Sequence, residues 1–170
     1  MIEQHFLTFS AHKLTQLSGR IQDCLGRLSS EQVWARGHEN ENSVGNLVLH
    51  LCGNVDQWIG SGIGGKPDDR QRDAEFAARG NIQPAELSER LDKTVTEAAG
   101  TIRHLAHTRL SDKLTIQKYD ITMMEAIYHV VEHFAQHTGQ IIFATKLLTG
   151  QDLGYYKHLS HPTPRTEPRP

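Results

Sequence analysis

The sequence of 170 residues lacks the features that mark membrane, secreted and nucleic-acid-binding proteins. No apolar run approaches the roughly 20 residues that a membrane-spanning helix needs, and no basic segment followed by an apolar one opens the chain as in a secretory signal. The 18 lysines and arginines are scattered, and the formal net charge is −2, so we expect no basic patch for nucleic acid. The two cysteines, Cys24 and Cys52, do not have the spacing of a metal-binding motif. We therefore expect a cytoplasmic protein with reduced, buried cysteines that binds neither membranes nor nucleic acid.

Apolar residues recur with a helical period over most of the chain. This pattern predicts four helices, over residues 4–28, 43–59, 84–105 and 122–148. Ser43 is suited to cap the second of these helices, and Thr122 with Glu125 is suited to form a capping box on the fourth. Gly150 follows the fourth helix, where a glycine commonly ends one.

A chain of this length usually forms one domain. Four amphipathic helices joined by long connections predict an all-α protein, a four-helix bundle, over residues 1–160. The connection 109–120 contains spaced apolar residues that suggest a short extended piece. The proline-rich residues 161–170 are expected to form a disordered tail.

The predicted fourth helix contains three histidines, His129, His133 and His137, at successive spacings of four. On a helix they form one stripe. His129 and His137 are about 12 Å apart along the axis, so all three cannot bind one ion. Relative to the apolar stripe of this helix, His137 lies nearest the core and His129 farthest from it. We therefore predict that His133 and His137 are the metal-binding pair, and that His129 faces outward and supports the site or an interface.

A third ligand has to come from another helix, and His50 is the best candidate. It lies at the flank of the apolar face of the second predicted helix, one turn before Asn54. Alone, a histidine in this place more often borders an apolar seam. The inward pair on another helix favours its interpretation as a ligand.

These segments, Asn-Leu-Val-Leu-His at residues 46–50 and His-x-x-x-His-x-Gly-Gln at residues 133–140, resemble the DinB-like metalloprotein superfamily. This superfamily includes YfiT-like metal hydrolases and bacterial thiol transferases. The closer likeness is to a DinB-like branch with His-x-x-Gly-Asn, here residues 50–54, and Thr-Gly-Gln-Ile, here residues 138–141. The similarity covers about residues 34–156. It implies a DinB-like four-helix bundle in which His50, His133 and His137 bind a divalent metal. Because the ligands are imidazoles, we expect this metal to be zinc or nickel.

Two interpretations of function stay open. Three histidines leave a coordination position free, as in catalytic zinc sites, which favours a metal-dependent thiol S-transferase or hydrolase acting on a small molecule. The alternative is a metal-binding or stress-response module without turnover. No general base stands out, because Glu132 faces outward on the helical wheel. Asn54, His129 and Gln140 are candidates to support the ligands.

The charged segment 66–76 follows a glycine-rich stretch and also allows two interpretations. It is either a solvated loop whose charges pair locally, or a flap over the open end of the metal groove. In the second case Arg70, Arg72, Asp73 and Glu75 are candidates for contact with the substrate.

Four large rings, Trp34, Trp58, Tyr128 and Phe143, are not obviously absorbed by a four-helix core. Exposed aromatic surface on a small protein often marks a contact site, and this predicts a homodimer. The alternative is that the charged loop or the segment near Tyr155 covers these rings within one chain.

Overall fold

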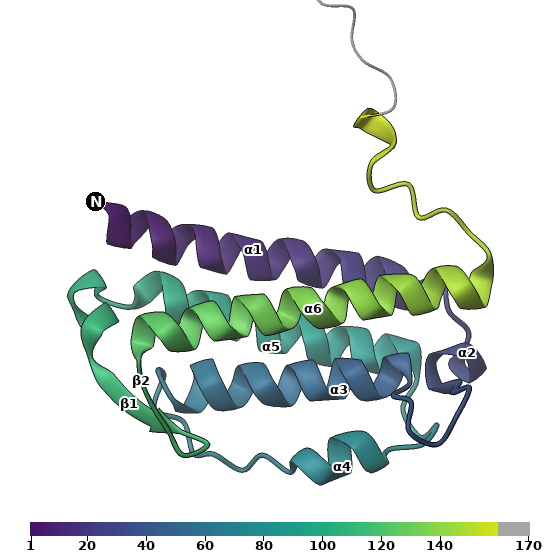
Figure 1. Ribbon diagram of the computed structural model, residues 1–170, viewed down its shortest axis with the longest axis horizontal. Helices are drawn as coiled ribbons and strands as arrows, with labels where there is room; N and C mark the ends of the chain where they lie inside the picture. The colour runs from purple at the N-terminus through teal and green to yellow at the C-terminus, as the bar shows by residue number, and fades with distance from the viewer. Residues whose placement is uncertain (160–170) are drawn as a thin grey trace, which may run out of the picture.

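The computed structural model describes residues 1–159, and four long helices dominate this range (Figure 1). These are α1 (Ile2–Leu25), α3 (Val44–Val55), α5 (Pro84–His104) and α6 (Met123–Thr149). Both α1 and α3 pack against α5 and α6, so the four helices enclose one core. The predicted all-α four-helix bundle is confirmed. The tail predicted at residues 161–170 lies outside the described residues.

Short elements fill the connections between the long helices. They are α2 (Ser30–Trp34), the π-helix η1 (Asp56–Ser61), α4 (Arg72–Ala77), the 3-10 helices η2 (His107–Ser111) and η3 (Lys157–Leu159), and the strands β1 (Lys113–Ile116) and β2 (Tyr119–Thr122). The sequence pattern indicated only the extended piece, which is an antiparallel hairpin pairing Lys113 with Thr122. Its two turn residues, Gln117 and Lys118, have positive φ angles of 51° and 71°. Left-handed residues at both positions are what a tight two-residue hairpin turn requires.

The ends of the helices follow the capping residues. The side chain of Ser43 accepts a hydrogen bond from the backbone of Asn46, and Thr122 forms the predicted capping box with Glu125. Gly150 ends α6 with a left-handed φ of 66°. The first helix ends at Leu25 rather than at residue 28, because Ser29 starts α2 with a capping box of its own.

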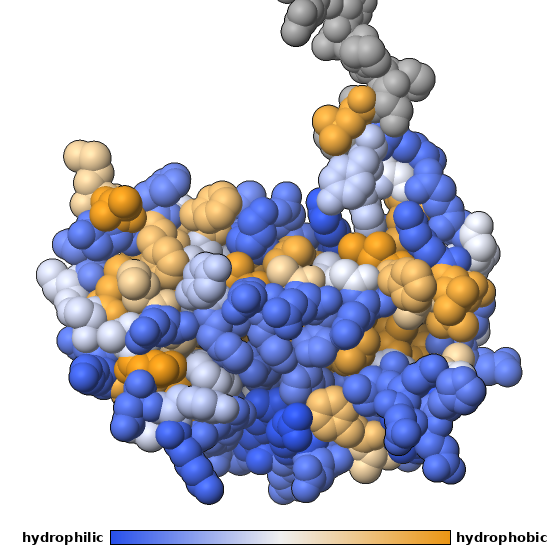
Figure 2. All heavy atoms as spheres, viewed as in Figure 1, coloured by the Kyte–Doolittle hydropathy of each residue, from blue (hydrophilic) through white to orange (hydrophobic). Residues whose placement is uncertain are grey.

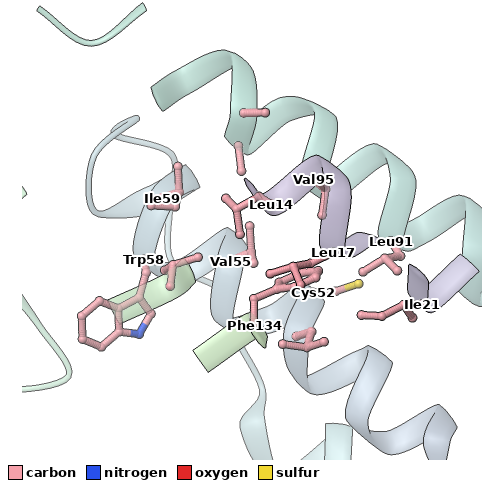
Figure 3. Close-up of a cluster of buried hydrophobic side chains, with 14 of the residues drawn as sticks. Leu14, Leu17, Ile21, Cys52, Val55, Trp58, Ile59, Leu91, Val95 and Phe134 are labelled. Carbon is pink, nitrogen blue, oxygen red and sulfur yellow. The ribbon is translucent and has the colours of Figure 1, made fainter. Parts of the chain in front are cut away.

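The core lies where the inner faces of the helices meet, and Figure 3 shows part of it. Leu14 and Ile21 of α1, Val55 of α3 and Phe134 of α6 are fully buried there. Cys24 and Cys52 are also buried and free, as predicted. Burial raises the pKa of the Cys52 thiol to about 12, so this cysteine is inert at neutral pH.

Two of the four large rings do not stay outside the core, which corrects the prediction. Trp58 is only 4 % exposed and packs beside the buried cluster (Figure 3). Trp34 is half-buried, and its indole N–H donates a hydrogen bond to the backbone oxygen of Ile82 over 2.9 Å. Tyr128 and Phe143 are 62 % and 69 % exposed, as predicted for the outer side of α6.

The surface in Figure 2 is mostly polar, with apolar side chains gathered in smaller groups, one of them near the C-terminal end of α6. Within residues 1–159, none of the helices has both the length and the apolar character that crossing a bilayer demands.

Candidate metal centre

The site is built where α3 and α6 run side by side. The ring of Trp58, in η1 directly after α3, lies 4.0 Å from that of His129, and the ring of His50 lies 5.2 Å from that of His137. Residue numbers rise along one helix while they fall along the other, so the two helices are antiparallel here. Side chains four residues apart on each helix therefore face one another in pairs.

Three imidazole nitrogens converge at this seam. Nε2 of His133 lies 3.2 Å from Nε2 of His50 and 3.1 Å from Nε2 of His137. The ligand atoms of these three residues all lie within 4.8 Å of one another. Two nitrogens bound to one tetrahedral zinc ion at about 2.0–2.1 Å are roughly 3.3 Å apart. The observed spacing therefore fits a set of three ligands around one ion.

Hydrogen bonds behind two of the rings leave their lone pairs free for this ion. Nδ1 of His50 lies 3.0 Å from Oε2 of Glu75, and Nδ1 of His137 lies 2.6 Å from Oε1 of Gln140. Both oxygens are acceptors, so each ring carries its N–H at Nδ1 and a lone pair at Nε2. Nε2 of His133 can donate a hydrogen at most to one of these lone pairs. Without an ion, at least one pair of lone pairs would therefore face each other at close range. A cation between the three nitrogens removes this repulsion, so the three ligand atoms fit a divalent metal.

Burial favours the neutral imidazoles of His133 and His137, and the neutral form is the one that binds a metal. Burial, together with the neighbouring His137 and His50, lowers the pKa of His133 to about 3. Burial also lowers the pKa of His137, although the hydrogen bond to Gln140 acts in the opposite direction.

The support of His50 comes from the charged segment 66–76. Glu75 is 8 % exposed, and Arg70 donates from Nε to its Oε1 over 2.8 Å and from Nη2 to its Oε2 over 2.9 Å. Burial alone would raise the pKa of Glu75, but hydrogen bonds from Arg70 and His50 outweigh it and hold the pKa below its usual value. The Glu75 carboxylate is therefore charged, and it anchors the Nδ1–H of His50.

The segment is thus neither a fully solvated loop nor a set of side chains that all point to a substrate. Glu75 accepts from Nδ1 of His50, and Nη2 of Arg70, which donates to Glu75, lies 3.2 Å from the same nitrogen. The guanidinium of Arg72 lies 5.0 Å from the ring of Phe76, which in turn lies 4.7 Å from that of His50. Asp73 is exposed, and across the described range it takes no part in the hydrogen bonds of the site.

Two residues that hold α4 against α3 were not predicted from the sequence. A Cβ atom added to Gly53 would collide with the carboxylate of Glu75, so the absence of a side chain there allows Glu75 to reach His50. Asn46 is fully buried, and its Nδ2 donates to the backbone oxygens of Glu75 and Ala78 over 2.8 and 3.1 Å. The His-x-x-Gly-Asn pattern includes Gly53, but it does not predict a contact with Glu75, which follows 22 residues later.

The remaining candidates fall into two groups. Gln140 bonds to His137, as described above. His129 is half-buried rather than outward, because its ring lies against that of Trp58 at 4.0 Å, tilted by 31°, and 5.6 Å from that of His133. Burial lowers the pKa of His129. Asn54 is 4 % exposed, and no hydrogen bond joins it to any histidine of the described chain.

Comparisons with known proteins agree with this architecture. A family model described as "Protein of unknown function (DUF1572)" matches residues 1–165. The chain is similar to the crystal structure of a conserved protein from Enterococcus faecalis, with a TM-score of 0.70 and 16% identity, over 84% of this chain and 96% of that one. It is also similar to a DinB-like protein from Bacillus cereus ATCC 10987, with a TM-score of 0.64 and 14% identity, over 78% of this chain and 86% of that one. No curated protein matches the sequence. The fold is thus DinB-like, as the sequence resemblance implied.

Proposed function

Because this chain belongs to the DUF1572 family and has a DinB-like bundle, we propose that it is a divalent-metal-binding protein in which His50, His133 and His137 bind one zinc or nickel ion. The observation that carries the proposal is the convergence of three Nε2 atoms at 3.1 and 3.2 Å. Imidazole is the ligand that these metals share.

We further propose that the site is catalytic, as a thiol S-transferase or a hydrolase. A divalent ion held by three imidazoles leaves a position free, and it lowers the pKa of a water molecule or a thiol there. The surroundings favour a small anionic molecule, because half-buried Phe76 lies beside His50 and exposed Arg72 lies over the Phe76 ring, so a cation stands next to an apolar ring. A low-molecular-weight thiol with a carboxylate has this chemistry. In the transfer, its sulfur bonds to an electrophilic carbon and the leaving group departs with the bonding electrons.

One observation favours the alternative of a metal-binding or stress-response module without turnover. Glu75 is the carboxylate at the centre, and it is occupied by Arg70 and His50. It is therefore not free to act as a general base. A transferase needs a base less than a hydrolase does, because a thiol already loses its proton near neutral pH when a metal binds it.

The function is tested with purified protein stripped of metal and reloaded with zinc or nickel. Transfer of cysteine or glutathione to a fluorogenic alkyl halide tests the first activity, and ester and amide hydrolysis test the second. The proposal predicts turnover that requires metal and is lost in His137→Ala. Full metal content without turnover in either assay would favour the non-catalytic module, and turnover independent of metal would contradict the proposal.

We also propose that the protein acts in the cytoplasm as a homodimer. Exposed Tyr128 and Phe143 on α6 support pairing through this helix. Light scattering at micromolar concentration is expected to give twice the 19.1 kDa mass of one chain. The mass of a single chain would contradict this part of the proposal.

A further inference from the structure

Three buried polar atoms of α3, η1 and α6 have no hydrogen-bond partner within residues 1–159. They are Oδ1 of Asn54, Nε1 of Trp58 and Nδ1 of His133. Asn54 and Trp58 are both 4 % exposed. Buried polar atoms in native proteins nearly always have a partner, either in the protein or in an ordered water molecule. Three such atoms at one seam therefore need an explanation.

The antiparallel alignment brings these atoms to facing positions. Trp58 contacts His129 at one end of the seam, and His50 contacts His137 at the other. Asn54 lies midway between His50 and Trp58, and His133 lies midway between His137 and His129. Asn54 therefore opposes His133 across the seam.

The three atoms are also complementary as donors and acceptors. When His133 binds a metal through its lone pair at Nε2, its hydrogen lies at Nδ1, which is then a donor. The indole nitrogen of Trp58 is a donor as well. Oδ1 of Asn54 is an acceptor, and the opposite orientation of its amide would place a third donor there. One buried water molecule typically makes about three hydrogen bonds, and here it can accept two and donate one.

We propose that Asn54 is the positioning residue for His133. Its Oδ1 holds the Nδ1–H of His133 through one buried water molecule, which also accepts the indole N–H of Trp58. The inference rests on the proposed metal site and completes it. Each of the three imidazoles then has an oxygen acceptor behind its ring, from Glu75 for His50, from Gln140 for His137 and from Asn54 for His133. Such acceptors fix the tautomer and the orientation of a metal-binding histidine.

The test compares Asn54→Leu, which removes the acceptor at similar volume, with Asn54→Asp, which keeps an acceptor oxygen. Nitrogen NMR of the imidazoles in the metal-free protein reports the tautomer of His133. In the metal-free protein Nε2–H of His133 can also donate to the lone pair of His50 or His137, so both forms are present. We expect a larger share of the Nδ1–H form in the wild type and in Asn54→Asp than in Asn54→Leu. Zinc affinity is expected to fall about 10- to 100-fold in Asn54→Leu and to return in Asn54→Asp. An unchanged tautomer and affinity in Asn54→Leu would overturn the inference, as would an aspartate variant that behaves like the leucine variant.

Trp58→Phe is the control for packing, since it keeps a ring against His129 and removes only the N–H. We expect it to leave the tautomer of His133 unchanged and zinc affinity within about threefold of the wild type. A loss as large as that in Asn54→Leu would overturn the assignment to Asn54. A wild-type protein that binds no zinc would defeat the proposed function alone, because the tautomer is measured without metal.

Discussion

His50 and His137 lie at two ends of the same triad, but the chain holds them in different ways. His50 is anchored by Glu75 from a separate helix, α4, and Glu75 is itself fixed by Arg70. The side chains of Arg70 and Glu75 are 5 % and 8 % exposed. His137 is anchored by Gln140, an exposed residue one turn further along the same helix.

This difference in burial predicts that losing Glu75 lowers the free energy of unfolding more than losing Gln140. Water can replace an exposed amide oxygen, so the contact between Gln140 and His137 adds little net free energy. Removing the carboxylate from a buried guanidinium is far more destabilising, because it leaves a buried charge without a partner. The segment 66–76 therefore contributes to both the stability of the fold and the metal site. Gln140 only orients the ring of His137.

The largest effect is expected for Glu75→Ala. This variant leaves the charge of Arg70 buried and unpaired, so the free energy of unfolding should fall by about 3–5 kcal/mol. Urea unfolding of the metal-free protein measures this change. A loss below about 1 kcal/mol would show that Arg70 finds water instead, and the contrast with Gln140 would then fail.

Gly53→Ala sharpens the comparison without removing either charge. The added methyl group displaces the carboxylate of Glu75 from His50, so zinc affinity should fall about 10- to 100-fold. Gly139→Ala is the matched control, since a Cβ there meets nothing within 4 Å. It should keep zinc affinity and stabilise α6 by about 0.5–1 kcal/mol. Equal zinc affinities in the two variants would contradict the role assigned to Gly53.

Gln140→Ala tests the weaker support. We expect zinc affinity to fall up to about tenfold, which corresponds to the net worth of one hydrogen bond, about 0.5–1.5 kcal/mol. Competition for zinc with a chelator of known affinity measures this change. The midpoint of urea unfolding should hardly change. A loss that exceeds that of Gly53→Ala would reverse the proposed ranking.

The smallest effect is expected for Glu97→Ala. Its ion pair with Lys66 lies in the same region but is 42 % and 54 % exposed. Exposed pairs contribute about 0–1 kcal/mol, so the free energy of unfolding should hardly change. A loss near that of Glu75→Ala would mean that burial does not separate the two ion pairs.

Local signals explain what the sequence could predict. Ser43, Thr122 and Gly150 mark helix ends because capping depends on residues a few positions apart. The spacing of His133 and His137 placed them on one face for the same reason. Such signals predicted the bundle and the candidate ligands.

Contacts between distant segments explain what could not be predicted. Glu75 reaches His50 across 25 residues of chain, and only the packing of α4 on α3 brings them together. The burial of His129 likewise depends on Trp58, which lies on another helix. A helical wheel shows only one helix and no neighbouring element, so it placed His129 toward solvent.

The most direct test of the metal centre is the amount of metal bound by wild-type, His133→Ala and His129→Ala proteins. Each protein is loaded with zinc, and unbound zinc is removed by gel filtration. Inductively coupled plasma mass spectrometry then measures the zinc that remains. We expect one ion per chain in the wild type and in His129→Ala, and none in His133→Ala, because His133 lies between the other two ligands. One ion per chain in His133→Ala, or its loss in His129→Ala alone, would contradict the assignment of the three histidines.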